Sequence, residues 1–194
     1  RVLSNCYGAG LGAYCRKMGE CLAMTLTISG IDDRYTMQGE KISPELVDLL
    51  CEVIFNPKIE NKAFAEEDFN QCKRQLIEAI DAEYNEKRIY AISQLTSAMC
   101  ENEAYGIKRY GSREDVESLT AADMYEYWQN ALKNSRVEVM MLGSSNPDMA
   151  QKIITERFSQ LQRNVPEIKT EIIKDSTDVK SVTETSDIAQ AKLV

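Results

Sequence analysis

Histidine is absent from all 194 residues of the chain. The imidazole side chain is the common general base near neutral pH and a frequent metal ligand. Its absence excludes a His general base, a Ser-His or Cys-His nucleophile pair, and any His-ligated metal that this chain would hold alone. Chemistry that depends on imidazole therefore needs residues from outside this sequence.

Positive charge is also scarce. The chain has 23 Lys and Arg against 31 Asp and Glu, which gives a formal net charge of −8. Nucleic acids and anionic membranes require clustered Lys and Arg, so we expect neither as a partner. No run of eighteen apolar residues and no charged-then-apolar leader occurs, so the sequence predicts no membrane span and no signal peptide. Residue 1 is Arg rather than Met, so the natural N-terminus, with any leader, can lie upstream.

No C-x-x-C motif occurs, which removes the strong spacings of zinc and redox sites. A bridge across a hairpin could join Cys15 to Cys21, but the scattered positions favour buried, reduced thiols. Reduced thiols predict a reducing compartment, and we expect the cytoplasm. The cysteines are Cys6, Cys15, Cys21, Cys51, Cys72 and Cys100.

One long helix is predicted from Phe64 to Glu86, where no Gly or Pro interrupts the pattern. Its length of roughly 30 Å is enough to cross a small domain, so we expect the other segments to pack on it. Glu83 falls on its apolar side, and we expect this carboxylate to reach a buried Arg or Lys, or a backbone cap. Apolar residues recur in helical steps at Phe69, Cys72, Leu76, Ile77, Ile80 and Tyr84.

The remaining pattern predicts strands and shorter helices around this element. Helix caps are expected at Ser43, Ser112, Thr120 and Asn146. The order predicts an α+β fold, a two-layer sandwich in which a mixed, mostly antiparallel sheet packs against several helices, including the long central one. The strands are predicted at 11–16, 20–29 and 136–142, and the further helices begin near residues 43, 88, 121 and 146.

Residues 1–165 are expected to form one domain. After Pro166 the composition turns to Lys, Glu, Thr and Ser. We therefore expect 166–194 to be a polar edge strand or a linker towards a missing second half.

Three stretches, taken in order, resemble the pitrilysin/insulinase-like zinc peptidases, the inverzincins. This family has a "GG-x-L-N-A" strand, a long helix carrying a Glu, a "P-Y-G" loop, then "G-x-x-E…L-T" and a strand ending in "V-G". The resemblance spans residues 6 to 165, and the turn at 17–20 is closest to bacterial, non-catalytic members. The matching residues are Gly8 to Tyr14, Gln75 to Ile80, and Ala104-Tyr105-Gly106 followed by Gly111, Glu114, Leu119-Thr120 and Val137 to Gly143.

The resemblance implies a zinc site that this chain does not complete. In the family, H-x-x-E-H on a helix supplies two ligands and the general base. That helix would lie upstream of Gly8, outside this sequence. The third ligand is a Glu on the long helix, where Glu78 matches, and a solvated carboxylate is the plain alternative for this residue. A second family Glu is here Gln71, and the family's Asn is Gly12.

No catalytic residue and no metal are therefore expected in this chain. Zinc would be a cofactor only if an upstream segment carries H-x-x-E-H. Glu78 matches the family's third ligand position, and we expect it to be vestigial. By the resemblance, Gly12, Tyr14 and Glu78 are the predicted substrate-binding positions.

Three functions compete. The first is a non-catalytic peptidase-homology domain that supplies chamber wall and partner interface to a zinc peptidase or peptidase-like protein, and this chain alone would not be an enzyme. The second is a fragment of an active zinc endopeptidase, and the third is an unrelated α+β protein-interaction module. The expected partners are a second homologous domain or sister subunit, a peptide or small protein, and a further copy of the chain through exposed apolar surface.

Overall fold

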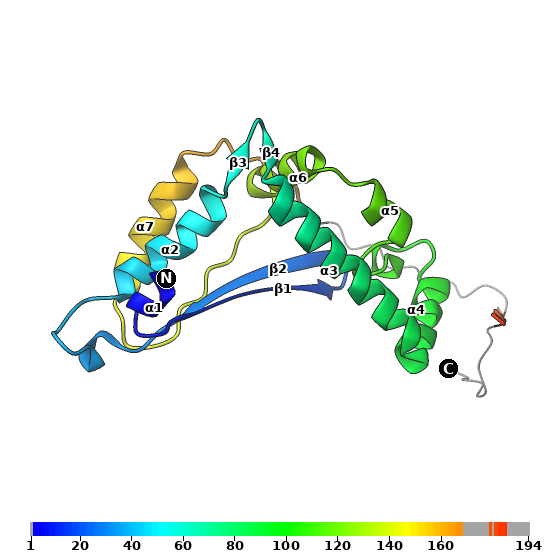
Figure 1. Cartoon of the computed structure of the whole chain (residues 1–194), viewed down its shortest axis with the longest axis horizontal. Helices are drawn as coiled ribbons and strands as arrows, with labels where there is room; N and C mark the ends of the chain where they lie inside the picture. The colour runs from blue at the N-terminus through cyan, green and yellow to red at the C-terminus, as the bar shows by residue number, and fades with distance from the viewer. Residues whose placement is uncertain (1, 169–178, 180, 186–194) are drawn as a thin grey trace. The chain divides into compact units, whose positions relative to one another are not determined.

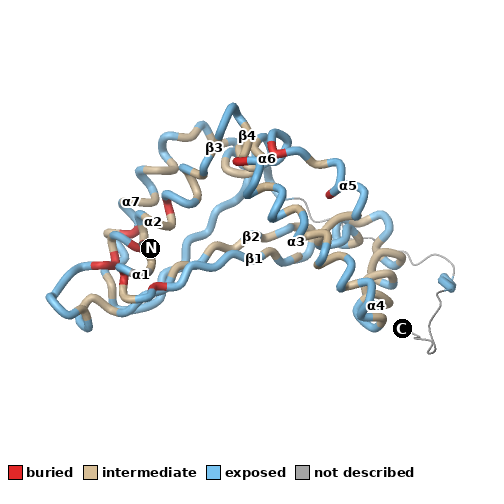
Figure 2. Tube along the Cα trace, in the orientation of Figure 1, coloured by how far each residue is buried: buried red, intermediate tan, exposed pale blue. Residues whose placement is uncertain are grey.

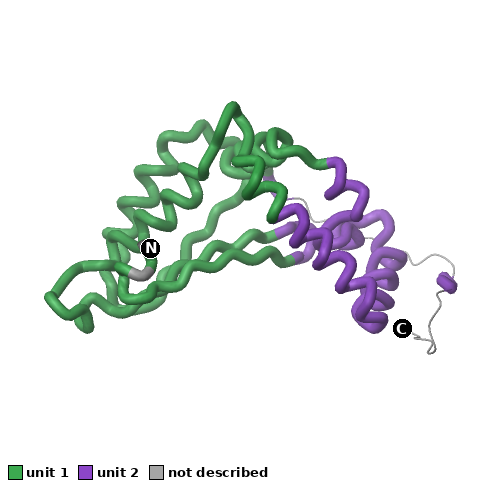
Figure 3. The backbone as a smooth tube through the Cα atoms, viewed as in Figure 1, with its two compact units in different colours: residues 1–16, 23–71, 119–166 green, residues 17–22, 72–118, 167–194 purple. Residues whose placement is uncertain are grey.

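The computed structural model describes residues 2–168, 179 and 181–185, and its chain divides into two compact units (Figure 3). The described residues are about 51% helical and 13% strand, which confirms the α+β class. Unit 1 comprises residues 1–16, 23–71 and 119–166, and unit 2 comprises residues 17–22, 72–118 and 167–194.

The predicted hairpin is present. After a short helix α1, Val2–Asn5, strand β1 runs over Gly10–Met18 and pairs with β2, Cys21–Ser29 (Figure 1). Gly19 takes a φ of 56° in the turn between them, a conformation that suits a residue without a Cβ. The two-residue turn lies where the sequence analysis expected it.

The core of unit 1 forms around the start of α2, Ser43–Phe55 (Figure 2). Cys6, Ala9, Ile42 and Leu46 are buried together, and Ile28 of β2 packs against them. Loop residues Asp33–Tyr35, a single 3₁₀ turn labelled η1, lead into this helix. On the same face of β2, Leu22 and Met24 are 60% and 59% exposed, so of these three residues only Ile28 reaches the core.

Helix α7, Pro147–Ser159, packs along α2 (Figure 1). The rings of Phe55 and Phe158 meet edge to face with centroids 4.8 Å apart. Nη2 of Arg157 lies 3.0 Å from Oε1 of Glu52. An aromatic contact and an ion pair therefore fix this helix pair.

The other part of unit 1 joins α6, Ala121–Asn134, to a small antiparallel pair, β3 (Ile59–Glu60) and β4 (Ala63–Phe64). The Phe64 ring contacts Tyr125 and Trp128, with centroids 6.5 and 6.1 Å away. These two aromatic residues therefore have a packing role. Helix α6 begins with a capping box between Thr120 and Asp123, so the cap predicted at Thr120 is confirmed.

The strand predicted over 136–142 is wrong. Within the part of the chain that the structure describes, this segment joins no sheet. Met140 is 88% exposed and Leu142 is fully exposed. A strand exists only where a neighbour supplies a hydrogen-bonded ladder, and the apolar sequence RVEVMML does not specify that neighbour.

In unit 2, α3 (Glu66–Asn85) enters from unit 1 and is followed by α4, Lys87–Met99. A 3₁₀ turn η2, Ala104–Gly106, packs against α4, and α5 covers Arg113–Ser118. The long helix is confirmed within two residues of its expected ends. The expectation that this helix forms the packed centre of the fold is wrong. The structure describes all twenty of its residues, and none of them is buried.

The cap predicted for α2 is also wrong. The hydroxyl of Ser43 makes no cap bond to its own helix and instead donates to Oδ1 of Asp33 at 2.9 Å. The same carboxylate oxygen accepts from the backbone N–H groups of Ile42 and Ser43, each at 3.0 Å. A carboxylate ten residues upstream therefore supplies the acceptor that a helix N-terminus needs.

We expect Asp33→Ala to lower the free energy of unfolding by about 1–2 kcal/mol, the usual effect of losing a helix cap. Urea unfolding followed by the fluorescence of Trp128, the only tryptophan, measures the change in unit 1. Asp32→Ala is the matched control, because this substitution removes the same charge one residue away. The Asp32 carboxylate bonds mainly to its neighbour Arg34. Equal losses from both variants would contradict the assignment of Asp33 as the cap.

Most of the predicted polar tail lies outside the described residues. Residues 166–168, 179 and 181–185 are described, and none of them is in a strand. Among the helices of the described chain, none is both long and apolar enough to cross a bilayer.

Candidate functional site

Unit 2 contains a cavity of about 270 Å³. It lies between the last turns of α3, the start of α4 and the loop that leads into α5. Its walls come from Ile80, Asp81, Glu83, Tyr84 and Tyr90, and from residues 108, 110 and 111–114.

The helical repeat places three of these residues together. Ile80, Glu83 and Tyr84 are three and four positions apart, so they share one face of α3. Glu83 is half-buried there, which confirms the expectation that it lies on the apolar side. The chain then turns at residue 86, and α4 brings the ring of Tyr90 to 4.9 Å from that of Tyr84, edge to face.

A charged cluster contributes Asp81 and Arg113 to the lining. Nη1 of Arg113 lies 2.5 and 2.7 Å from the two carboxylate oxygens of Asp81, and Nε lies 2.8 Å from Glu117. The hydrogen bond to Asp81, followed by that to Glu117, raises the pKa of Arg113 above its ordinary value. The hydroxyl of Ser112 accepts from the N–H of Asp115 at 3.0 Å, so the cap predicted at Ser112 is confirmed.

Tyr90 is fixed from the C-terminal side of the chain. Its hydroxyl donates to the carboxylate of Glu184, at 3.0 and 2.9 Å from the two oxygens. Burial, followed by this hydrogen bond, raises the pKa of Tyr90 above its ordinary value. Sequence analysis missed this contact, since nothing in the sequence links two residues 94 positions apart.

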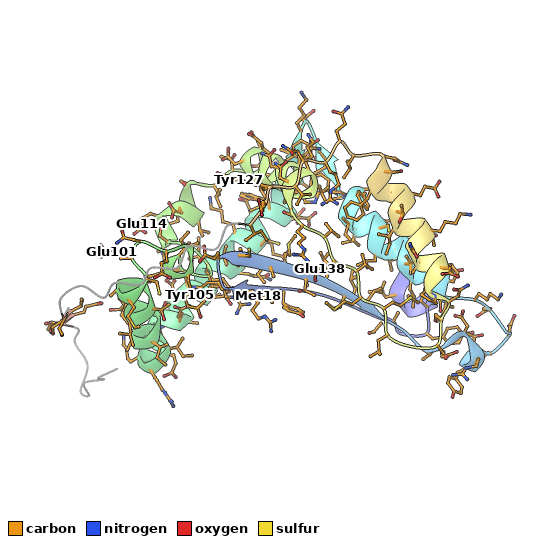
Figure 4. All side chains as sticks on the ribbon, turned by 180° about the vertical axis from the view of Figure 1, so that it is seen from behind. Met18, Glu101, Tyr105, Glu114, Tyr127 and Glu138 are labelled. Atoms are coloured by element: carbon orange, nitrogen blue, oxygen red, sulfur yellow. The ribbon has the colours of Figure 1, made fainter. Side chains whose placement is uncertain are left out.

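The Ala104-Tyr105-Gly106 stretch holds the end of the hairpin within unit 2. Nζ of Lys17 donates to the carbonyls of Tyr105 and Ile107, the latter at 2.9 Å, and lies 4.5 Å from the centroid of the Tyr105 ring. Figure 4 labels Tyr105 beside Met18, the last residue of β1. The stretch that resembles the family's "P-Y-G" loop therefore holds the turn between β1 and β2 through Lys17.

The predicted substrate-binding residues lie in separate units. Gly12 and Tyr14 share one face of β1 in unit 1, and the Tyr14 side chain is 52% exposed. A Cβ at Gly12 would lie 3.0 Å from Oγ1 of Thr27, so a larger residue would displace this hydroxyl. Glu78 is exposed on α3 in unit 2 and lies 3.8 Å from Nε of Arg74 one turn earlier. This is the environment of a solvated carboxylate.

Metal ligands do not gather in the described residues. No group of three or more His, Cys, Asp or Glu side chains in residues 2–168, 179 and 181–185 is arranged to hold an ion. Of the cysteines, Cys6 and Cys51 are buried as expected, whereas Cys72 is exposed, because the face of α3 that carries it is open. All six thiols are free.

The sequence could have indicated part of the cavity. The helical repeat placed Glu83 on the apolar side of the long helix, where a carboxylate is unusual. Tyr84 belongs to the same repeat, but its contact with Tyr90 depends on the angle between two helices. The sequence did not indicate Arg113 as a residue of the cavity, because an arginine in a short helix is ordinary.

Comparison with known proteins gives one relative among curated sequences. The chain is 27% identical over 191 residues to "Probable inactive metalloprotease YmfF" of Bacillus subtilis (strain 168). The match covers 98% of this chain and 45% of the relative, so the chain spans less than half of that protein's length. No protein-family model matches the chain.

A solved structure is also similar. The crystal structure of a conserved protein from Enterococcus faecalis V583 superposes with a TM-score of 0.65 and 28% sequence identity, over 69% of this chain and 31% of that one. The fold therefore has a known counterpart. The match to the Bacillus subtilis protein supports a relationship between this chain and inactive metalloprotease-like proteins.

Proposed function

We propose that this chain is a non-catalytic, pitrilysin-like peptidase-homology domain. In this role it contributes peptide-chamber wall and partner interface to a zinc peptidase or a peptidase-like protein. The observation that carries the proposal is the similarity, over nearly the whole chain, to a probable inactive metalloprotease. The absence of histidine from the sequence agrees with it, because an H-x-x-E-H site cannot form from these residues.

Exposed apolar surface supports a partner interface. Ile89, Ile92 and Met99 follow the helical repeat along α4, and they are 53%, 46% and 72% exposed. An amphipathic helix normally buries such a stripe, and open stripes mark sites of protein interaction. Residues 137–142 in unit 1 add a second exposed apolar segment. A second homologous domain or a sister peptidase subunit is the partner that the proposal assigns to these surfaces.

The hairpin supports contact with peptide. In the described part of the chain β1 pairs only with β2, so its other edge presents backbone N–H and C=O groups. An extended peptide can add to such an edge as a further strand. Tyr14 would contact its side chains, and Gly12, which has no side chain, would allow its backbone to approach.

The test incubates the 194-residue chain with zinc and a pool of unstructured peptides. We expect less than stoichiometric zinc by elemental analysis and no chelator-sensitive cleavage by mass spectrometry. Peptides should nevertheless be retained by the immobilised chain. Tyr14→Ala should weaken retention about fivefold, the usual scale for removing one aromatic contact.

Tyr35→Ala is the matched control, since Tyr35 is another exposed tyrosine of unit 1 and lies on η1 rather than on the hairpin. It should leave retention unchanged. Stoichiometric zinc with chelator-sensitive cleavage would overturn the proposal in favour of an active peptidase. Equal losses from the two tyrosine variants would remove β1 from the peptide site.

A further inference from the structure

Helix α4 carries an apolar stripe on the side that points away from the packed part of unit 2. Tyr90 and Ser97 lie on the packed side, because Tyr90 lines the cavity and the Ser97 hydroxyl donates to the carbonyl of Gly106. The stripe lies on the other side of the helix, and its side chains are between 38% and 72% exposed. Its members are Ile89, Ile92, Leu95 and Met99.

The spacing of this stripe is nearly the same when α4 is read from either end. Arg88 lies four positions before Ile92, and Glu103 lies four positions after Met99. Leu95 lies near the middle of this stretch. Two copies of α4 placed side by side and antiparallel therefore set Ile92 of one copy against Met99 of the other. The two Leu95 side chains then meet close to the two-fold axis.

The charges at the two ends of α4 have opposite signs. At the N-terminal end Glu86 and Lys87 offset each other, which leaves the exposed Arg88. The C-terminal end is followed by Glu101 and Glu103, and the last carbonyl groups of the helix add partial negative charge. No charged residue occurs between 89 and 99. A parallel pair would bring like charges together, whereas an antiparallel pair sets each Arg88 beside the acidic end of the other copy.

We infer that α4 is the contact through which two copies of this chain associate, as an antiparallel helix pair about a two-fold axis. The partner is a second copy because the stripe is complementary to itself, both in its apolar spacing and in the charges at its ends. The stripe is small beside the roughly 800 Å² that each partner buries in a stable complex, so we expect a dissociation constant of about 10–100 µM. The inference rests on the proposed function only in taking the stripe to be an interface.

Sedimentation velocity of the 194-residue chain at increasing concentration measures this association. We expect a monomer–dimer equilibrium, because a two-fold contact closes on itself. Ile92→Lys should weaken the dimer at least tenfold, since it places an unpaired charge in the centre of the contact. Leu142→Lys is the matched control, as it makes the same kind of change at a fully exposed apolar residue of unit 1. It should leave the dimerisation constant unchanged.

Charge reversal tests the direction of the pair and the identity of the partner. Arg88→Glu and Glu103→Arg should each weaken the dimer about fivefold, because each variant brings like charges together at both ends of the contact. The Glu103 side chain makes no cap bond to η2, so its replacement should leave that turn intact. An equimolar mixture of the two variants should restore the affinity of the unaltered chain, since each copy then meets the opposite charge on the other.

Three results would overturn the inference. A chain that stays monomeric at every concentration would assign the stripe to a different protein, such as the sister subunit of the proposed function. Equal losses from Ile92→Lys and Leu142→Lys would place the contact elsewhere. A mixture of the charge-reversed variants that does not recover would exclude an antiparallel pair.

These results are independent of the peptide assay. Peptide retention by a chain that remains monomeric would leave the proposed function in place and remove the pairing through α4. A dimer that behaves as expected on charge reversal but retains no peptide would keep the α4 contact and remove the peptide-binding role.

Discussion

Replacing Gly106 by alanine is expected to destabilise unit 2 by about 3 kcal/mol, the upper range for an overpacked site. The added Cβ would lie 2.1 Å from the carbonyl oxygen of Cys100 and 2.8 Å from its carbonyl carbon. Backbone atoms cannot rotate out of the way as a side chain can. The clash would therefore separate η2 from α4, where the hydroxyl of Ser97 donates to the Gly106 carbonyl at 3.2 Å.

Hydrogen exchange measures this effect within unit 2. The amides of α4 should lose protection in Gly106→Ala, while those of α2 and α7 in unit 1 keep theirs. Gly111→Ala is the control in the same loop. Gly111 has a φ of 72° and nothing within 4 Å of an added Cβ, so only backbone strain of about 1 kcal/mol is expected. Equal losses would show that close packing is not why residue 106 is glycine.

Leu46→Ala should cost about 3 kcal/mol of unit 1 stability, the centre of the range for a buried leucine. Leu46 is 7% exposed and packs with Cys6, Ala9 and Ile42. Gly30 leaves room for it, since a Cβ at that position would lie 2.5 Å from Cδ1 of the leucine. Truncation opens a cavity that this surrounding backbone cannot close.

Urea unfolding followed by Trp128 fluorescence gives the change directly. Leu142→Ala removes the same atoms from a fully exposed leucine of the same unit, so it should alter stability by less than about 0.5 kcal/mol. A small effect at Leu46 would mean that the cluster around α2 is not the stabilising core of unit 1.

Local signals were sufficient to predict most helices. The capping box at Thr120 and the cap at Asn146, whose side chain accepts from the N–H of Asp148 at 2.9 Å, lie within three residues of what they bind. Asn56 is the C-terminal cap of α2, and its backbone N–H donates to the carbonyl of Glu52 four residues earlier. These contacts are encoded by neighbours in the sequence, so the sequence alone predicts them.

The failures concern contacts between distant residues. Asp33 caps a helix that starts ten residues later, and the segment 136–142 has the composition of a strand without a partner. In the site, the helical repeat showed that Glu83 was misplaced, but not that it would face a cavity. The contacts of Lys17 with Ile107 and of Tyr90 with Glu184 join residues 90 and 94 positions apart, so only the folded chain brings them together.

We expect segment 136–142 to promote self-association when the chain is concentrated. It combines β-branched and long apolar side chains with no proline, and its two charges neutralise each other, because Arg136 lies 2.7 Å from Glu138. Short segments of this kind promote aggregation when no neighbour covers them. Natural sequences place unpaired charges or proline beside such strands as gatekeepers, and here neither is present between 136 and 142. We therefore expect the chain to be more soluble when a neighbour covers this segment than when it is exposed.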